Sequence, residues 1–438
     1  MMTLEDYLAQ DARLYPDKIA VVCGEEACSY MELYERVRER SVAFNSKRGK
    51  VVLIRASQNT DFIVEYCAIH MAGAVAAPME RDTPQELFDE LTEELATQTV
   101  PEDTADVLYT TGTTGRSKGV MISHRTIIAD AENLIAGQGF SHELTFIING
   151  PLNHIGSLSK IYPVIMQGAT LLIIDGMKDL NRFFQALDYP AVKMATFFVP
   201  ANVRILTQLC ANRLASYADK IDFIECGGAP LAHADMLDLC RLLPKTRLYN
   251  TYASTETGII STYNYNDGRC LVGCLGKTMP HSHIIITPEG HISCQGDTLM
   301  SGYIGDPELT ATVLRDNTVY MSDLGRLDDE GMLHIGGRQD DVINLGGYKV
   351  APTEVEDATM SMPGVKDCIC ISVPHPITGN ALKLLVVTAD SKPLNKRQLA
   401  LFLKERLEVY KVPMLYEQVE TIERTYNGKL DRKFYRQL

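Results

Sequence analysis

A glycine- and threonine-rich segment that follows a short apolar run constrains this chain most. Residues 109–119 read Y-T-T-G-T-T-G-R-S-K-G, directly after Val107 and Leu108. Glycines let a backbone approach a ligand closely and turn its N–H groups inward, and hydroxyls and an ammonium add further donors. The segment therefore predicts a loop that binds polyphosphate. Its candidate binding residues are Thr110, Thr111, Gly112, Thr113, Thr114, Gly115 and Lys118.

The spacing differs from that of the common nucleotide loop, G-x-x-x-x-G-K-[ST]. Gly112 is followed by Gly115, and the residue after Lys118 is Gly119 rather than serine or threonine. A kinase or P-loop ATPase is therefore disfavoured. A solvated turn would account for the glycines, but not for the clustered hydroxyls and the lysine behind a strand.

Size and charge narrow the class of protein. A chain of 438 residues is too long for one compact core and predicts two or three domains. The net charge of −14 makes nucleic acid or an anionic membrane an unexpected partner. The first residues carry Glu5, Asp6 and Asp11, and no apolar run reaches membrane-spanning length, so we expect a cytoplasmic protein without an integral membrane segment.

The eleven cysteines lack a C-x-x-C pair, which favours free, buried or partly buried thiols.

Strand-like apolar runs alternate with helical patterns, which predicts an α/β fold. Strands are expected at residues 18–23, 51–56 and 170–174, and helices at residues 33–44, 62–72 and 126–136. Between residues 271 and 302 short runs are broken by glycine and proline, which indicates a small antiparallel or barrel-like unit. A further small domain follows, with strands at 367–373 and 383–388 and a helix at 396–407.

A second polar cluster, N-T-Y-A-S-T-E-T-G, occupies residues 250–258. Tyr252 offers a flat face for a base, Thr255 offers a hydroxyl, and Glu256 offers a hard oxygen ligand suited to Mg²⁺. The alternative to a binding role is a structural one, because a glutamate beside threonines is usually only a turn or helix-start signal.

Two further pieces lie nearer the C-terminus. Asp323 has the chemistry to accept both hydroxyls of a ribose, and Arg338 has the chemistry to pair with ribose or phosphate oxygens. Lys429 belongs to an N-G-K turn. Taken singly, such an aspartate is commonly structural and such a lysine is commonly solvated.

Together the pieces resemble the AMP-forming adenylation family, which includes acyl-CoA synthetases, peptide synthetase adenylation domains and luciferases. Six motifs stand in the family's order over nearly the whole chain. They are Y-T-T-G-T-T-G-R-S-K-G at 109–119, P-L-N-H-I-G at 151–156, Y-A-S-T-E at 252–256, S-D-L-G at 322–325, G-R-Q-D-D-V-I-N-L-G-G-Y at 337–348 and N-G-K-L-D-R at 427–432.

The resemblance implies a large N-terminal domain of layered α/β subdomains with a small distorted β-barrel, followed by a small mobile α+β lid domain. We place the core at residues 1–337, its barrel-like part at about 260–335, and the lid at 338–438. Asp340 falls at the family's hinge position, and Gly346 and Gly347 would face the thiol tunnel after the lid rotates. Between Ala77 and Tyr109 there is room for only about one helix, so the first subdomain is expected to be trimmed.

The same resemblance implies the reaction. ATP and a carboxylate form an acyl-adenylate and pyrophosphate, and the thiol of CoA, as co-substrate, then takes the acyl group. It also implies roles for individual residues. By the resemblance, Glu256 binds Mg²⁺ and Thr255 contacts the α-phosphate. The adenine is bound by Tyr252, Gly228 and Ala229, and the ribose is bound by Asp323 and Arg338. His154 gates the carboxylate, and Lys429 bridges the carboxylate and the α-phosphate.

The substrate class and the acceptor remain open in part. Residues 155–168 lack the aspartate with which peptide synthetase domains pair an α-ammonium, so a plain aliphatic or aryl acid is favoured. His154 is alternatively a packed, hydrogen-bonded histidine. The rival functions are loading of an acyl carrier protein's phosphopantetheine and a degenerate paralogue that only binds nucleotide. The residues that argue against degeneracy are Lys118, Glu256, Asp323, Arg338 and Lys429. Asn344 stands where many members of the family carry a lysine.

Overall fold

The computed structural model describes residues 2–110, 118–338, 341–345, 348–376, 379–389, 393–425 and 429–436. Several predicted site residues lie outside the described residues. They are Thr111, Gly112, Thr113, Thr114, Gly115, Asp340, Gly346 and Gly347.

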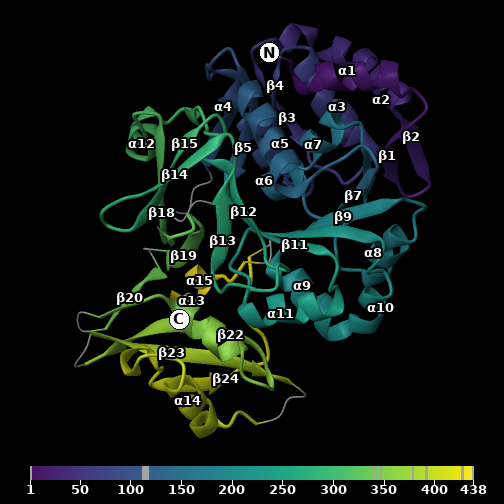
Figure 1. Cartoon of the computed structure of the whole chain (residues 1–438). Helices are drawn as coiled ribbons and strands as arrows, with labels where there is room; N and C mark the ends of the chain where they lie inside the picture. The colour runs from purple at the N-terminus through teal and green to yellow at the C-terminus, as the bar shows by residue number, and fades with distance from the viewer. Residues whose placement is uncertain are drawn as a thin grey trace.

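A large twisted sheet runs through the N-terminal part of the molecule (Figure 1). Its parallel half ends at β11, and from β12 onward the neighbouring strands are antiparallel. In spatial order its strands are β14 (Ser282–Ile286), β15 (His291–Gly296), β18 (Thr318–Leu327), β19 (Leu333–Arg338), β13 (Cys274–Thr278), β12 (Gly258–Asn264), β11 (Arg247–Ser254), β10 (Ile221–Cys226), β9 (Lys193–Phe198), β7 (Leu144–Ile148), β8 (Thr170–Ile173), β1 (Ile19–Cys23) and β2 (Glu26–Ser29), with β17 (Leu314–Arg315) on β18.

A second sheet carries the strands on either side of the predicted phosphate loop. Its order is β16 (Gly302–Tyr303), β6 (Lys118–Ser123), β5 (Thr104–Thr110), β4 (Val75–Met79) and β3 (Val51–Arg55). β3, β4 and β5 are parallel, so their carboxyl ends meet at one edge. One helix, α4 (Gln85–Ala96), lies between β4 and β5.

Helices cover both sheets and join them. Helix α5 (His124–Gln138) contacts β6 of the smaller sheet and β12 of the larger one. The main core gathers apolar side chains from these helices and from both sheets. The others are α1 (Leu4–Leu14), α2 (Tyr30–Ser41), η1 (Val42–Lys47), α3 (Thr60–Met71), α6 (Ile155–Leu158), α7 (Ile161–Met166), α8 (Leu180–Leu187), α9 (Pro200–Leu209), α10 (Ala211–Ala215), α11 (His233–Leu242) and α12 (Pro307–Val313).

The C-terminal residues form a small α+β unit with a core of its own, drawn at the foot of Figure 1. Its elements are β20 (Ile343–Leu345), β21 (Tyr348–Val350), α13 (Pro352–Met360), β22 (Val365–His375), β23 (Gly379–Thr388), α14 (Lys396–Lys404), η4 (Val409–Lys411), β24 (Leu415–Gln418) and α15 (Arg432–Arg436). The predicted fold class, a large N-terminal part and a small C-terminal one, agrees with this architecture.

The local chemistry explains where elements begin. Helix α2 begins at Tyr30, three residues before the predicted start, because Ser29 and Glu32 form a capping box. It ends at Ser41 and continues as the 3₁₀ turn η1 rather than as α-helix to residue 44. Helix α5 ends at Gln138 and is followed by Gly139, whose positive φ of 74° suits glycine.

Candidate active site

The ends of the predicted phosphate loop are fixed by a β-hairpin. β5 and β6 pair in antiparallel register up to Thr110 and Lys118, which face each other as the last pair. Gly119 packs tightly, because a Cβ there would lie 2.7 Å from Ile304 Cγ2 and 2.9 Å from Val107 Cγ1. The hairpin therefore presents Thr110 and Lys118 at the carboxyl edge of the sheet.

Tyr303 links the predicted phosphate lysine to the predicted metal ligand. Its ring centroid lies 5.5 Å from Lys118 Nζ, and its hydroxyl donates to Glu256 Oε1 at 2.9 Å. Burial and the negative charge of Glu256 raise the pKa of Tyr303, so the hydroxyl stays protonated and remains a donor. Motif reading missed Tyr303, because β16 is a two-residue strand without a sequence pattern.

A tight turn after β11 positions Thr255 and Glu256. Ser254 Oγ accepts a hydrogen bond from the Thr257 amide at 3.1 Å, and Glu256 O accepts one from the Met300 amide at 2.9 Å. Gly258 ends the turn with a φ of +65°, and a Cβ there would lie 2.3 Å from Asp130 Oδ1. Thr255 and Glu256 are both half-buried at this turn.

The predicted base and ribose residues contact each other directly. The Tyr252 hydroxyl, from β11, donates to Asp323 Oδ2, from β18, at 2.6 Å, and both side chains are buried. The register of β18 and β19 places Arg338 opposite Asp323. The side chain of Arg338 lies outside the described residues, so the structure supplies only its backbone position.

The turn that follows β10 lies against β11. A Cβ on Gly227 would lie 3.1 Å from Thr251 O, one residue before Tyr252. Gly228 has a φ of +80°, which favours glycine, and Ala229 follows it. The structure therefore brings Gly228 and Ala229 to the carboxyl end of the parallel strands, beside the strand that carries Tyr252.

His154 precedes the short helix α6 and lies near a residue of the C-terminal unit. Its Nε2 atom is buried without a hydrogen-bond partner in the described part of the chain. Burial, together with the positive charge of Lys429, lowers the pKa of His154 to about 4. The C-terminal unit therefore sits in an orientation in which the ammonium of Lys429 acts on His154. The two residues lie 275 positions apart in the sequence.

Arginine–aspartate contacts hold the C-terminal unit in this orientation. Arg204 of α9 lies 2.8 Å from Asp235 of α11 and 2.8 Å from Asp367 of β22. Asp367 also lies 2.7 Å from Arg424, and the His233 amide donates to Asp357 Oδ1 at 2.9 Å. We name the contact among Arg204, Asp367 and Arg424 the lid latch. No motif singled out these residues.

A buried ion pair joins Lys160, in the segment that follows His154, to Glu225 of β10. Lys160 Nζ lies 2.8 Å from Glu225, and each side chain is 1% exposed. The ammonium also lies 5.4 Å from the ring centroid of Phe197. That ring packs closely on the backbone, because a Cβ on Gly156 would lie 3.1 Å from it.

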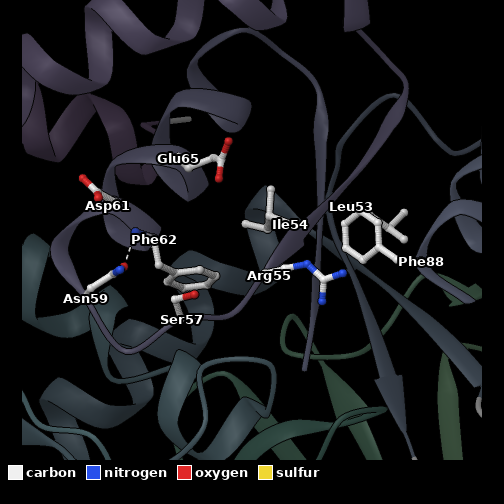
Figure 2. Close-up of a pocket in the computed structure, with 9 residues that line it drawn as sticks. All are labelled: Leu53, Ile54, Arg55, Ser57, Asn59, Asp61, Phe62, Glu65 and Phe88. Carbon is white, nitrogen blue, oxygen red and sulfur yellow. Dashed lines mark hydrogen bonds between the residues drawn. The ribbon is translucent and has the colours of Figure 1, made fainter. Parts of the chain in front are cut away.

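A separate cavity of about 290 Å³ opens beside β3 and α3 (Figure 2). Arg55 stands over the Phe88 ring at 4.6 Å and donates to the Thr83 carbonyl at 2.7 Å. Among the residues that the structure describes, none of the predicted site residues lines this cavity. Because β3 and β5 end at the same edge, it neighbours the predicted site without being part of it.

Two models of known families match the chain. The family model described as AMP-binding enzyme matches residues 8–94 and 84–304. A second, the AMP-binding enzyme C-terminal domain, matches residues 354–429. The chain belongs to the AMP-binding enzyme family. The family's members are adenylate-forming enzymes, so the family membership predicted from the sequence motifs is confirmed.

Two curated relatives that match the chain are CoA ligases. The 2-succinylbenzoate–CoA ligase of Bacillus mycoides (strain KBAB4) is 26% identical over 487 residues, covering 100% of this chain and 99% of the relative. The feruloyl-CoA synthase of Amycolatopsis sp is 27% identical over 427 residues, covering 93% and 83%. The first alignment is longer than the 438 residues of the chain, so that relative holds stretches without a counterpart here.

Solved structures share the fold over the whole chain. ATP-bound MatB from Rhodopseudomonas palustris has a TM-score of 0.87 at 23% identity, covering 100% of this chain and 99% of its own. The O-succinylbenzoate coenzyme A synthetase MenE from Bacillus subtilis, in complex with AMP, has a TM-score of 0.83 at 21% identity, covering 98% and 97%. The predicted fold class is confirmed.

These findings confirm the predicted enzyme class and reaction. This AMP-binding enzyme is an acid–thiol ligase that adenylates a carboxylic acid with ATP and forms a CoA thioester. None of the helices in the described part of the chain combines the length and apolar character needed to cross a membrane. All eleven cysteines are free, and each is buried or half-buried, as predicted.

Proposed function

We propose that the enzyme activates a plain aliphatic or aryl carboxylic acid and transfers the acyl group to free CoA. One observation carries the proposal: Lys429 of the C-terminal unit lies close enough to His154 to lower the pKa of its imidazole. The positive charge of Lys429 thus acts on His154, although the two residues lie far apart in sequence.

Glu256 is the proposed ligand of the magnesium ion. Tyr303 anchors one of its oxygens, Oε1, and Oε2 makes no hydrogen bond within the described part of the chain. A carboxylate oxygen is the donor that Mg²⁺ prefers, so the residue fits the ion. Glu256 would hold the ion, which would supply positive charge to offset the negative charge of the phosphates. Lys118 and Thr110 stand at the adjoining hairpin end to bind the β- and γ-phosphates.

The nucleoside would lie along the ends of β10, β11 and β18. We assign the adenine to the turn Gly228–Ala229 and the Tyr252 ring, and the ribose hydroxyls to Asp323 and Arg338. The bond from the Tyr252 hydroxyl fixes the orientation of the Asp323 carboxylate before the nucleotide binds. Such preorganisation lowers the cost of ordering the site.

The two half-reactions use different groups. In the first, the substrate carboxylate attacks the α-phosphorus, an acyl–O–P bond forms, and the bond to the β-phosphate oxygen breaks to release pyrophosphate. Lys429 and Thr255 stabilise the charge that grows on the α-phosphate and the carboxylate. The neutral imidazole of His154 packs beside the carboxylate without adding a charge. In the second, the CoA sulfur attacks the acyl carbon, and AMP leaves.

The lid would act between these steps. We propose that residues 338–438 rotate about Asp340 relative to residues 1–337, carrying Lys429 away and bringing Gly346 and Gly347 to the thiol tunnel. Small residues there would let the pantetheine arm approach.

The buried ion pair supports a plain acid as substrate. Glu225 is a fully buried carboxylate near the segment that follows His154, and Lys160 already neutralises it. Glu225 is therefore not free to pair with an α-ammonium group, and an unpaired charge in a partly dry pocket is costly. The Phe197 ring offers an apolar surface on the same side. The relatives named above act on 2-succinylbenzoate and on ferulate, both aryl acids by name.

The test is carboxylate-dependent ATP–pyrophosphate exchange over a panel of short, medium, long and aromatic acids, with amino acids of matched side chains. Exchange with at least one plain acid and none with its amino acid counterpart supports the proposal. Equal exchange with the amino acids would overturn the substrate class. Absence of exchange with every acid would favour a nucleotide-binding paralogue without catalysis.

The acceptor is tested separately. The acid that gives exchange is supplied with either free CoA or a carrier protein bearing phosphopantetheine, and thioester formation is followed. Faster acylation of free CoA supports the proposal, and faster acylation of the carrier would reassign the enzyme to carrier loading.

A further inference from the structure

A histidine-rich cluster lies in the N-terminal part of the molecule, apart from the residues assigned to catalysis. It joins Glu5 of α1, His70 of α3 and His124, the first residue of α5. The three side chains border a cavity of about 400 Å³. His124 and Lys118 stand at opposite ends of β6, so the cluster lies roughly 20 Å from the phosphate loop at about 3.3 Å per strand residue.

One candidate ligand atom from each of the three residues converges on a small volume. These atoms all lie within 4.8 Å of one another. The His70 Nδ1 atom lies 3.1 Å from Glu5 Oε1. Two ligands bonded to Zn²⁺ at about 2.0 Å in a tetrahedral arrangement stand about 3.3 Å apart, so this separation already matches a shared metal.

His124, the second histidine of the cluster, supplies an independent observation. His124 Nδ1 is buried without a hydrogen-bond partner in the described part of the chain. Its ring centroid lies 5.2 Å from that of His70, edge to face. A buried polar atom without a partner is unfavourable, and a metal ion is one way to satisfy it.

The second nitrogen of His70 is held as metal-binding histidines are held. His70 Nε2 lies 3.0 Å from Asp106 Oδ1, and Tyr66 donates to the other oxygen, Oδ2, at 2.8 Å. Both His70 and Asp106 side chains are 0% exposed. A carboxylate on the far nitrogen fixes the tautomer and the ring plane, and it strengthens the near nitrogen as a ligand.

We propose that Glu5, His70 and His124 form a zinc site that ties α1 to α3 and α5. Two imidazoles and a carboxylate suit Zn²⁺, and the cavity leaves room for water as a fourth ligand. Mg²⁺ prefers oxygen ligands and would not compete here. Binding replaces the Nδ1 proton that His70 otherwise shares with Glu5. Because α1 and α3 are joined through this site, the metal stabilises the N-terminal part of the fold.

The test uses the full chain after treatment with a chelator and without nucleotide. Zn²⁺ is titrated by calorimetry, and Co²⁺ is added separately to record its visible absorption. We expect one equivalent of Zn²⁺ per chain and a rise in the unfolding temperature. The visible absorption typical of four-coordinate Co²⁺ is also expected. His124→Ala and Glu5→Gln should each weaken Zn²⁺ affinity at least about tenfold.

His124→Ala removes a half-buried side chain, so its fold, checked by circular dichroism, should persist. The matched control is His281→Ala, because His281 meets Glu132 and Asp297 at a partly exposed position. That variant should bind Zn²⁺ like the unaltered chain. Absence of stoichiometric binding would overturn the proposal, and so would Zn²⁺ affinities of His124→Ala and Glu5→Gln equal to that of the unaltered chain. Either result would leave His70 as the centre of a structural ion pair.

Discussion

At the scale of the residue, the chain's charged groups divide into a few buried pairs and many exposed ones. Lys160 and Glu225 form one of the buried pairs, at 1% exposure each. Burying both charges is costly, and breaking such a pair leaves one of them uncompensated. The pair thus makes a sharp test of how this region is held.

We predict that Lys160→Ala lowers the free energy of unfolding by about 3–5 kcal/mol, because Glu225 keeps its buried charge without a partner. Denaturant titration measures the change. The control is Lys245→Ala, whose partner Asp219 is 96% exposed, and it should change stability by less than about 0.5 kcal/mol. Equal effects of the two variants would contradict a buried, paired Lys160.

His154 predicts a dependence of stability on pH. Its folded pKa of about 4 lies below the ordinary value of 6.5, so the unfolded chain binds a proton more readily. The contribution of the neutral ring is present above pH 6.5 and is lost as the pH falls from 6.5 toward 4. His154→Gln lacks this titration, so the stability difference between the two proteins should shift in favour of the variant over that window. Urea titrations at several pH values measure the difference, and a constant difference would be inconsistent with a buried neutral His154.

Glu256 is the residue on which the magnesium proposal rests. Glu256→Gln should abolish Mg²⁺-dependent exchange while leaving the fold intact, because a neutral amide oxygen is a poor partner for a hard cation. Exchange measured over a range of Mg²⁺ concentrations gives the result. Glu289→Gln, at an exposed turn, should keep full activity. Survival of exchange within a few-fold in Glu256→Gln would remove it as metal ligand.

Much of the candidate site could be predicted from the sequence, because its motifs are contiguous. Tyr252, Glu256 and Asp323 each stand in a short polar run after an apolar one. Tyr303 and Arg204 could not be predicted, because they act through contacts between elements distant in sequence. No local pattern records such contacts.

At the scale of the element, boundaries follow caps and pairing more closely than apolar content. The strand predicted at 51–56 is observed as β3, Val51–Arg55, since each residue of β3 finds a partner in β4. The pairing of β16 with β6 joins residues about 180 apart in sequence, as Gly302 faces Met121. Periodicity predicts that strands exist but not which strands become neighbours.

The lid latch gives a prediction at this scale. Asp367→Asn weakens the ion pair between β22 and Arg204 of α9. This ion pair helps to keep the C-terminal unit in the orientation in which Lys429 lies near His154. Losing a hydrogen bond between charged groups costs about 1.5–3 kcal/mol, and partial retention by the amide should leave exchange about 3–10-fold slower. Thioester formation from pre-formed acyl-adenylate should not slow.

Asp219→Asn is the control, because its carboxylate is 96% exposed and lies in the N-terminal part. It should change neither half-reaction. If Asp367→Asn slowed both half-reactions equally, the latch would be a general stabilising contact rather than one that selects a lid orientation.

At the scale of the whole molecule, the order of motifs along the chain predicted two parts, and the structure has a separate core in each. The sequence did not predict the orientation of the small part on the large one. That orientation depends on contacts such as Arg204 with Asp367, whose partners lie 163 residues apart. The boundary at residues 337 and 338 and the hinge at Asp340 stay predictions.

The central claim is that the C-terminal unit delivers Lys429 for adenylation and withdraws it for thioester formation. Lys429→Ala removes a positive charge from a site where negative charge concentrates in the transition state, which typically costs about 10²–10³ in rate. Lys433→Ala, an exposed lysine of the same unit, is the matched control and should behave like the unaltered enzyme.

The most direct measurement follows both half-reactions with the same preparation of Lys429→Ala: ATP–pyrophosphate exchange, and thioester formation from pre-formed acyl-adenylate and CoA. We predict that exchange falls about 10²–10³-fold while thioester formation is nearly unchanged. Parallel loss of both half-reactions, or loss of neither, would contradict the delivery of Lys429 by a moving lid.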